Sequence, residues 1–351
     1  MRIAMCHSTL PEAGRKPGGV EVYVHRLAQA LVAQGHDLEV FTHSERPPGA
    51  NYRTRRLPLR SAETNPFLRQ YVSPVLLNVE DFTHFDVAHL HGDDWFFWRR
   101  TLPVVRTFHG SALYEGRSAT SLRRRLDQRV IHRLELLARR LATSSYGVGT
   151  DSQSLYRTDG ILPPGVDLPE RDPEPSPTPT ILFVGTWEGR KRGSLLYDVF
   201  MREVKPAIPD AELWMVSDSC PPSDSVRWIR LPSDEELSNL YSRAWVFCMP
   251  SSYEGFGIPY LEAMAHGTPA VATRNPGAEM VLGGGRYGAL TDDEGLGPQL
   301  IELLRSRSRR DALARDGRSR AREYTWTRSA ELHEAAYREA IERYATRKGH
   351  R

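Results

Sequence analysis

Two glutamates lie close together in the segment SSYEGFGIPYLEAMAHG, residues 251–267. Glu254 and Glu262 are separated by seven residues, which include two glycines, an aromatic residue and a proline. A carboxylate accepts hydrogen bonds from neighbouring hydroxyls, and such charge-assisted bonds are strong. From the spacing alone, the pair could bind the hydroxyls at two ends of one ligand. The alternative is that Glu262 only complements a helix dipole and Glu254 is a solvated loop acid.

The residues around this pair predict a strand, a glycine-rich loop and a helix, in that order. WVFCMPSS is expected to form a buried strand, and SSYEGFG follows it as a loop. Gly255 and Gly257 let a ligand approach the backbone closely, because glycine has no Cβ. Pro259 suits the first turn of a helix, where its missing N–H costs nothing, and Glu262 then lies in that turn. Ligands of open α/β sheets bind beyond the carboxyl ends of the strands, where this loop is expected.

The chain as a whole predicts two domains of this kind. Its 351 residues exceed the ~250–300 at which a single hydrophobic core stops growing. Strand-like and helix-like segments alternate in both halves, which predicts α/β domains with parallel sheets covered by helices. The proline-rich segment 163–180 can hold neither a helix nor an inner strand. The predicted order is an N-terminal domain over 1–168, a linker over 169–180, a second domain over 181–325 and a C-terminal helix over 326–351.

Composition excludes several classes of protein. With 40% hydrophobic and 26% charged residues the chain should be globular, and no apolar run approaches the ~18 residues of a membrane span. The N-terminal MRIAMCHSTL lacks the long apolar stretch of a signal peptide and is interpreted as a first buried strand. Cys6, Cys220 and Cys248 are too widely spaced for a disulfide framework, so a cytoplasmic protein with reduced thiols is expected. The net charge of +3 gives no reason to expect a nucleic-acid partner.

The segment PSSYEGFGIPYLEAMAHGTPAVAT resembles the signature segment of the retaining glycosyltransferases of family four. The similarity runs without a gap, and its one departure is Ala270, where the family usually has valine. The resemblance implies the GT-B fold, in which two Rossmann-like domains with parallel sheets face a central cleft. It also implies that Glu254 binds the hydroxyls of a donor sugar and that Glu262 binds the ribose hydroxyls of its nucleotide. The neighbouring positions that it implies in donor binding are Gly255, Phe256, Gly257 and Ile258.

A nucleoside diphosphate sugar carries a diphosphate, which needs cations nearby. The strand TILFVG is followed by TWEGRKRGSLL, in which Arg190, Lys191 and Arg192 stand before Gly193. This cluster resembles a Gly-Arg-Lys-Gly variant of the family with one extra residue, and Thr186 stands where the family usually has an arginine. Arg190 and Lys191 are the expected diphosphate pair, with Arg192 able to replace either. The alternative is a solvated basic turn, since charge runs are common on surfaces.

The first half contains two further candidate positions. Gly18 and Gly19 stand at the start of a predicted helix, where consecutive backbone N–H groups can bind an anion. The family has a Gly-Gly loop here that reaches the donor phosphates or the acceptor, and His109, in TFHG, resembles the family's histidine near the anomeric carbon. The alternatives are a plain loop and a structural strand-end histidine. Other histidines near predicted strand ends, which could line the cleft, are His7, His89 and His91.

No metal or other cofactor is expected. The chain has no Asp-x-Asp motif, with which metal-dependent glycosyltransferases hold a cation on the diphosphate. It also has no histidine–cysteine cluster typical of zinc. Arginine and lysine would then neutralise the diphosphate by themselves.

An arginine-rich helix is predicted over SLRRRLDQRVIHRLELLARRLA, residues 121–142. A solvated helix face explains this composition, because acidic Asp127 and Glu135 interrupt it. The alternative is a face for anionic lipid or an acidic acceptor, which would make a peripheral membrane contact. The C-terminal segment 326–351 resembles the last helix of family four, which crosses back onto the N-terminal domain.

These residues predict a retaining, metal-independent glycosyltransferase that moves a sugar from a nucleoside diphosphate sugar to an acceptor hydroxyl. Arg190 and Lys191 would neutralise the leaving diphosphate, and Glu254 would orient the sugar. A flanking atom, such as one of His109, would stabilise an oxocarbenium-like centre. The expected acceptor is a saccharide, a lipid-linked glycan or a natural-product aglycone. Two alternatives are a sugar-nucleotide 2-epimerase of the same fold, which needs no acceptor, and a non-catalytic protein that binds the nucleotide sugar without turning it over.

Overall fold

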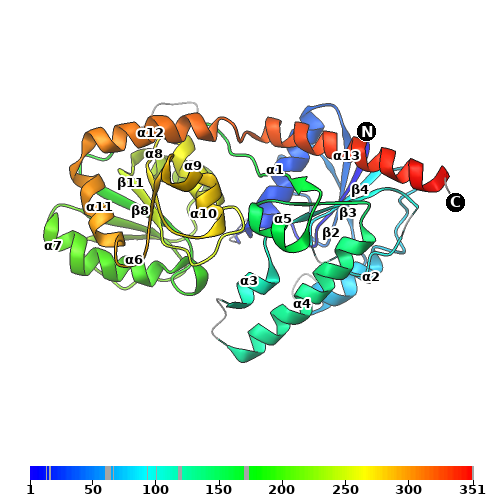
Figure 1. Ribbon diagram of the computed structural model, residues 1–351, viewed down its shortest axis with the longest axis horizontal. Coiled ribbons are helices and arrows are strands. Elements are labelled where there is room, and N and C mark those ends of the chain that lie inside the picture. Colours follow the sequence, from blue (N-terminus) through cyan, green and yellow to red (C-terminus); the bar gives the residue numbers. More distant parts are fainter. Residues whose placement is uncertain are drawn as a thin grey trace. The chain divides into compact units, whose positions relative to one another are not determined.

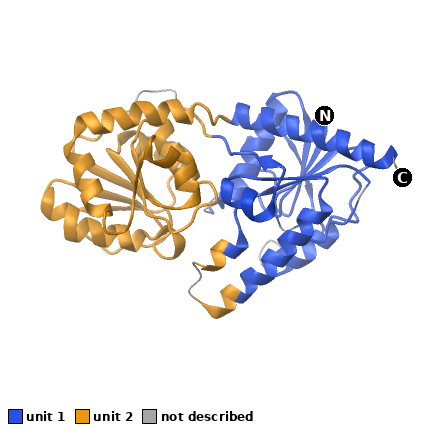
Figure 2. Cartoon of the chain, in the orientation of Figure 1, with its two compact units in different colours: residues 1–113, 126–165, 326–351 blue, residues 114–125, 166–325 orange. Residues whose placement is uncertain are grey.

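The chain forms two compact α/β units (Figures 1 and 2). Unit 1 consists of Met1–Leu113, Leu126–Gly165 and Trp326–Arg351, and unit 2 consists of Tyr114–Arg125 and Val166–Thr325. The structure is a computed structural model that describes residues 1–12, 14–15, 17–59, 65, 67–92, 94–99, 101–117, 121–169 and 174–349.

The two units and the predicted domains divide the chain at different positions. Unit 1 ends its middle segment at Gly165 rather than at residue 168, and the short segment Tyr114–Arg125 belongs to unit 2. Within the predicted linker 169–180, residues 170–173 lie outside the described residues. Neither division has a local signal in the sequence, because each depends on the core against which a segment packs.

Unit 1 is built around a parallel sheet of seven strands in the order β3-β2-β1-β4-β5-β6-β7. Strands β1, β4 and β5 are buried almost throughout, as expected of a parallel sheet, and they are neighbours in it. Their carboxyl ends therefore share one edge. The strands are β1 (Arg2–Cys6), β2 (Asp37–Thr42), β3 (Arg53–Arg56), β4 (Val87–Leu90), β5 (Val104–Phe108), β6 (Ser144–Gly147) and β7 (Gly160–Ile161).

The helices of unit 1 bury apolar stripes at helical spacing. In α1 (Gly19–Ala33) the stripe includes Val24, Leu27 and Leu31. The C-terminal helix α13 (Trp326–Gly349) packs against α1, β4 and β5, so the end of the chain completes the core of the first unit. The other helices of this half are η2 (Leu68–Val72), α2 (Ser73–Leu76), α3 (Ala112–Arg117), α4 (Leu122–Leu141) and α5 (Thr150–Tyr156), of which α3 and α4 share the segment 114–125 with unit 2.

Unit 2 has a parallel sheet of six strands in the order β10-β9-β8-β11-β12-β13. The predicted fold class, two α/β domains with parallel sheets, is thereby confirmed. The strands are β8 (Thr180–Val184), β9 (Glu212–Val216), β10 (Val226–Ile229), β11 (Val246–Met249), β12 (Ala270–Thr273) and β13 (Ala289–Thr291). The helices are η3 (Gly189–Lys191), α6 (Gly193–Val199), η4 (Phe200–Val204), α7 (Lys205–Ala207), α8 (Asp234–Arg243), α9 (Ile258–Ala265), α10 (Pro276–Val281), η5 (Gly283–Gly285), α11 (Leu296–Arg305) and α12 (Arg307–Ala321).

In the part of the chain that the structure describes, no helix combines the length and the apolar character needed to cross a membrane. Within the same residues, no group of three or more His, Cys, Asp or Glu side chains could hold a metal ion. Cys6, Cys220 and Cys248 are free thiols.

Candidate active site

The glycine-rich loop lies between β11 and α9, at the carboxyl end of the strand. Gly257 has a φ of 95°, which favours glycine, and a Cβ at this position would fall 2.5 Å from the ring of Tyr260. The amide of Gly277 donates to the Glu254 carbonyl at 3.0 Å, and the Tyr260 hydroxyl donates to the Met249 carbonyl at 2.8 Å. These contacts hold the loop so that Glu254 is only 5% exposed.

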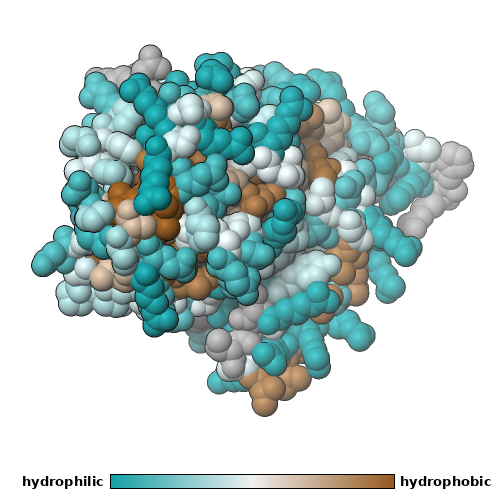
Figure 3. All heavy atoms as spheres, turned by 60° about the vertical axis from the view of Figure 1, so that its left-hand side comes forward, coloured by the Kyte–Doolittle hydropathy of each residue, from teal (hydrophilic) through white to brown (hydrophobic). Residues whose placement is uncertain are grey.

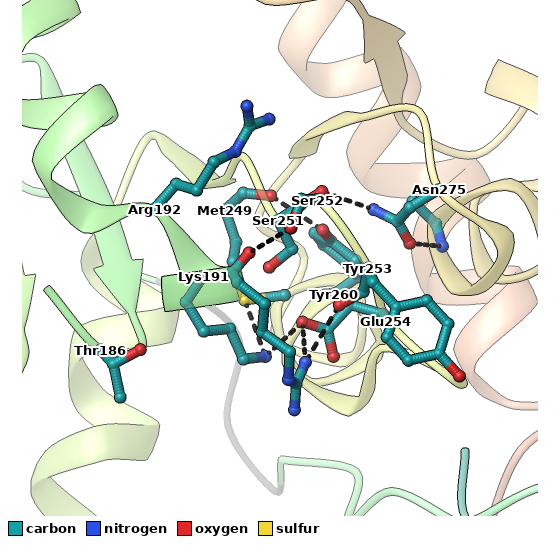
Figure 4. A network of polar contacts seen from close by, with 12 residues as sticks. Thr186, Lys191, Arg192, Met249, Ser251, Ser252, Tyr253, Glu254, Tyr260 and Asn275 are labelled. Atoms are coloured by element: carbon teal, nitrogen blue, oxygen red, sulfur yellow. Dashed lines mark hydrogen bonds and ion pairs between the residues drawn. The ribbon is translucent and has the colours of Figure 1, made fainter. Parts of the chain in front are cut away.

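The carboxylate of Glu254 lies between two cations (Figure 4). Its Oε1 atom is 2.6 Å from Nη1 of Arg190 and 2.7 Å from Nζ of Lys191. Nη1 of Arg190 also donates to the Tyr253 carbonyl at 3.1 Å, and Nζ of Lys191 lies 3.2 Å from Sδ of Met249. The two cations come from η3, which follows β8, and the carboxylate comes from the loop after the neighbouring strand β11. The structure therefore brings together three of the residues that the sequence singled out.

The charges of this cluster influence one another strongly. Burial raises the pKa of Glu254, but Lys191 and Arg190 outweigh this effect, and the pKa lies below its usual value. Burial lowers the pKa of Lys191. Glu254 and, less strongly, Glu262 act in the opposite direction, but the pKa stays below its usual value. Lys191 is thus within electrostatic reach of both glutamates of the loop and helix. Two cations share the single Glu254 carboxylate at ion-pair distance, an arrangement in which an anionic ligand can compete for them.

Arg192 is directed away from this cluster, as Figure 4 shows. Its guanidinium forms a bidentate ion pair with Asp293, at 2.7 and 2.9 Å, and donates to the hydroxyl of Thr273 at 3.0 Å. Nε donates to the Pro250 carbonyl at 2.6 Å. The sequence treated Arg192 as able to replace either neighbour, but these contacts engage its guanidinium in bracing the loop after β11 against the loop after β13.

Thr186 brings no charge to the site. It stands where the sequence comparison with family four expects an arginine, and its hydroxyl donates to the Glu188 carbonyl at 2.7 Å. Arg190 and Lys191 are accordingly the cations that face Glu254.

Glu262 lies in α9 and is held by a tyrosine of α8. The Tyr241 hydroxyl donates to Glu262 Oε2 at 2.9 Å, and the Tyr241 ring stacks on His266. His266 in turn bonds to the Glu262 backbone carbonyl through Nδ1 at 2.8 Å. Burial raises the pKa of Glu262, although Tyr241 and Lys191 act against it. Glu262 is therefore a partly buried acid held in position, and it lies in the second turn of α9 rather than in the first turn that the sequence predicted.

The Gly-Gly loop of unit 1 begins α1, with Gly18 as the N-cap. The amide of Gly18 donates to Glu21 Oε2 at 3.0 Å, and Glu21 Oε1 accepts from the Thr9 hydroxyl at 2.7 Å. Arg15 forms an ion pair with the same carboxylate at 2.9 Å. One of the amides expected to bind an anion is thus occupied by a carboxylate of the chain itself, and Gly19 follows it in the first turn.

Three histidines directly follow three neighbouring strands of unit 1. His7 follows β1, His91 follows β4 and His109 follows β5. His91 Nδ1 and His109 Nε2 are 3.0 Å apart, and Tyr23 packs edge-on against the His109 ring. Burial lowers the pKa of all three, to about 4 for His7, so these imidazoles are neutral at neutral pH.

The bond between His91 and His109 fixes which nitrogen of each ring carries the proton. His91 Nε2 is buried and has no hydrogen-bond partner within the described residues. A buried N–H without an acceptor is rare and costs about 1–3 kcal/mol. We therefore assign the proton to His91 Nδ1, which donates to His109 Nε2. His109 then carries its own proton on Nδ1.

The row of histidines continues into the core of unit 1. The rings of His89 and His91 are 3.8 Å apart, and His89 bonds to the Tyr337 hydroxyl at 2.7 Å. His333 of α13 bonds to the Tyr23 hydroxyl at 2.9 Å. Burial lowers the pKa of His89, and it lowers the pKa of His333 to about 4.

Unit 1 should lose stability as the pH falls from 7 to 5. The pKa of an unfolded histidine is ~6.5, so between this value and about 4 the unfolded chain binds a proton that folded His333 does not. Stability must then fall with falling pH, by on the order of 2 kcal/mol for one such residue between about pH 6.5 and pH 5. Urea denaturation at each pH, followed by hydrogen-exchange mass spectrometry, reports each unit separately. His333→Gln should flatten the pH dependence of the unfolding free energy of unit 1. His84→Gln is the control and should not, because the His84 side chain is exposed. Equal stability of unit 1 at pH 7 and pH 5 would contradict the expectation.

Two family models match the chain. Residues 17–170 match Glycosyltransferase Family 4, and residues 178–306 match Glycosyl transferases group 1. The chain belongs to glycosyltransferase family four. This confirms the resemblance seen in the signature segment. The first matched region of the glycosyltransferase contains Gly18, Gly19 and His109, and the second contains the charged cluster around Glu254.

Individual proteins agree with this family over nearly the whole length of the glycosyltransferase. It is 26% identical to D-inositol 3-phosphate glycosyltransferase of Corynebacterium urealyticum, an alignment that covers 96% of this chain and 95% of that protein. Sucrose-phosphate synthase from Thermosynechococcus elongatus has a TM-score of 0.79 at 22% identity, covering 97% of this chain and 99% of the other. Anabaena Alr3699/HepE, solved with UDP-glucose, has a TM-score of 0.73 at 14% identity, with coverages of 97% and 100%. These likenesses confirm the predicted GT-B fold.

Three residues that hold candidate positions, two in unit 1 and one in unit 2 of the glycosyltransferase, were not singled out from the sequence beyond the possible cleft lining of His91. Glu21, His91 and Tyr241 each hold a residue that the sequence did single out. Glu21 had a local signal, since an acid three residues after an N-cap is the pattern of a capping box. His91 was visible only as a strand-end histidine, and Tyr241 had no signal beyond its place in a polar helix.

Proposed function

We propose that the enzyme transfers a sugar from a nucleoside diphosphate sugar to an acceptor hydroxyl, with retention at the anomeric carbon and without a metal ion. The observation that carries this proposal is the buried Glu254 carboxylate held by Arg190 and Lys191 at the carboxyl end of β11. Names among the relatives support it. The Corynebacterium protein is named a D-inositol 3-phosphate glycosyltransferase, and the Anabaena structure holds UDP-glucose.

In the proposed complex, the donor diphosphate binds the two cations that Glu254 holds in the free enzyme. The phosphate oxygens replace part of the carboxylate's contacts with Arg190 and Lys191, and Glu254 then accepts hydrogen bonds from the sugar hydroxyls. Glu262 uses Oε2 to accept from Tyr241 and offers its other oxygen to the ribose hydroxyls. The two glutamates thus bind two ends of one donor.

The proposed reaction exchanges one bond at the anomeric carbon for another. The bond from this carbon to the diphosphate oxygen breaks, and the acceptor oxygen bonds to the same face. The acceptor's proton passes to the departing diphosphate. Arg190 and Lys191 stabilise the charge that develops on the leaving oxygen, and such preorganised charge is often the largest catalytic term. His109, which donates through Nδ1, hydrogen-bonds an oxygen of the sugar and does not take the acceptor's proton.

Calorimetric titration with UDP, dTDP, GDP and ADP should identify one diphosphate that binds in the micromolar range. The matching sugar nucleotides are then incubated with inositol phosphate, simple saccharides, a lipid-linked sugar and a phenolic aglycone, with and without EDTA. We expect a glycoside with the anomeric configuration of the donor, read by proton NMR, in equal yield with EDTA. Inversion or a loss of activity in EDTA would contradict the mechanism. An isomerised sugar nucleotide without any acceptor would show an epimerase, and binding without turnover would show a binding protein.

A further inference from the structure

The surface of α4 carries a row of exposed apolar side chains. Leu122, Leu126, Val130 and Leu137 are 77%, 60%, 52% and 39% exposed. Residues spaced by four, four and seven positions project to one side of a helix, so these side chains lie along one face, with Arg133 between Val130 and Leu137. Ala138 is the only residue of α4 that is classed as buried, at 4% exposure. A helix that packs one face on its own unit does not need a second apolar stripe on the opposite face.

Arginines border this apolar stripe. At about 100° per residue, Arg129, Arg133 and Arg140 project beside it along the same side of α4. In the described part of the chain, none of these three has an acidic partner within ion-pair distance, whereas Glu135 accepts from the Tyr156 hydroxyl. The basic residues of the helix are Arg123, Arg124, Arg125, Arg129, Arg133, Arg139 and Arg140.

We propose that α4 is a docking surface for a lipid bilayer that carries anionic headgroups. A helix with an apolar stripe bordered by arginines lies in the plane of the interface, with the stripe at the acyl boundary and the arginines at the phosphates. Each basic residue near an anionic surface strengthens the attraction to it. The helix has 20 residues, which gives it a length of about 30 Å along such a surface. The inference rests on α4 alone and is independent of the proposed reaction.

Charge decides between the bilayer and other apolar partners. A second copy of the chain docked through the same face would bring its own arginines against these, and the repulsion would oppose the contact. Figure 3 is turned about the vertical axis, so its lowest part corresponds to the lowest part of Figure 1, where α4 begins. Hydrophobic side chains lie beside hydrophilic ones on the surface there. An acidic protein partner would match the arginines but gives no reason for four exposed aliphatic side chains in one row.

Vesicle flotation of the full chain tests the proposal. We expect binding to phosphatidylcholine vesicles that contain phosphatidylglycerol, little binding to phosphatidylcholine alone, and weakening by salt. Leu126→Ser combined with Val130→Ser should reduce binding at least tenfold, since both aliphatic side chains would leave water at the acyl boundary. Arg129→Glu combined with Arg133→Glu should also reduce it at least tenfold.

Matched controls separate α4 from a general effect of exposed groups. Leu231→Ser removes an exposed apolar side chain of unit 2, and Arg307→Glu with Arg309→Glu reverses two exposed charges on α12. Neither control should change flotation, and all variants should keep the nucleoside diphosphate affinity of the wild type. Equal binding to neutral vesicles, equal losses in the controls, or binding to polyglutamate in place of vesicles would overturn the proposal.

Discussion

Replacing Glu254 by glutamine should abolish most sugar transfer and at the same time tighten the binding of a free nucleoside diphosphate. Glutamine keeps the shape of the side chain but removes the negative charge that Arg190 and Lys191 hold at 2.6 and 2.7 Å. A diphosphate must compete with this carboxylate for the same two cations, so removal of the charge favours the phosphate oxygens. Transfer falls because the amide no longer accepts charge-assisted hydrogen bonds from the donor sugar.

The two effects can be measured separately. We expect kcat/KM to fall on the order of 10²–10³-fold, as for the loss of one preorganised contact in a transition state. The diphosphate Kd, from calorimetry, should fall about tenfold, which corresponds to about 1.4 kcal/mol. Glu279→Gln is the matched control, because Glu279 is also an ion-paired acid of unit 2, 2.7 Å from Arg274, but lies at the surface. A Glu254→Gln variant that folds and loses diphosphate affinity along with transfer would show that the carboxylate only supports the loop.

The grouping of the charged cluster was predictable because each member follows a strand with a plain sequence pattern. TILFVG and WVFCMPSS form β8 and β11, which are neighbours in the sheet. Parallel strands end at the same edge, so the residues after them meet there. The pairing of these two strands is not written in either segment. It came from the resemblance to family four, which also supplied the place of the C-terminal helix.

The directions of adjacent side chains were not predictable. Lys191 ends the short helix η3, whereas Arg192 has a φ of 54°, which turns the chain so that the two side chains leave it differently. A positive φ at an arginine has no signal in the sequence, because the surrounding structure imposes it. The same holds for Tyr241, which reaches Glu262 only because α8 packs on α9. Contacts between elements depend on tertiary packing, which local periodicity does not encode.

Lys191→Met should remove diphosphate binding, whereas Arg192→Met should leave it intact and lower the melting temperature. Methionine preserves most of the volume of either side chain but removes its charge. Nζ of Lys191 is buried beside Glu254, in the cluster proposed to receive the diphosphate. Arg192 instead braces two loops through Asp293, Thr273 and Pro250. Without it, the Pro250 carbonyl and the Thr273 hydroxyl, both on buried residues, lose a donor, which costs about 1–3 kcal/mol each, whereas exposed Asp293 can be solvated.

Calorimetry and scanning fluorimetry on the two variants then assign the two adjacent cations. For Lys191→Met we expect diphosphate affinity to fall at least tenfold and kcat/KM on the order of 10²–10³-fold. For Arg192→Met we expect an affinity within about twofold of the wild type and a melting temperature lower by several degrees. The opposite pattern would place the diphosphate beside Arg192 and Asp293. Glu254 would then not lie next to the diphosphate, and its proposed contact with the donor sugar would be wrong. Both substitutions remove one positive charge from adjacent positions, so a general electrostatic effect would lower the diphosphate affinity of both variants equally. Different affinities of the two variants would therefore arise from the different directions of the two side chains.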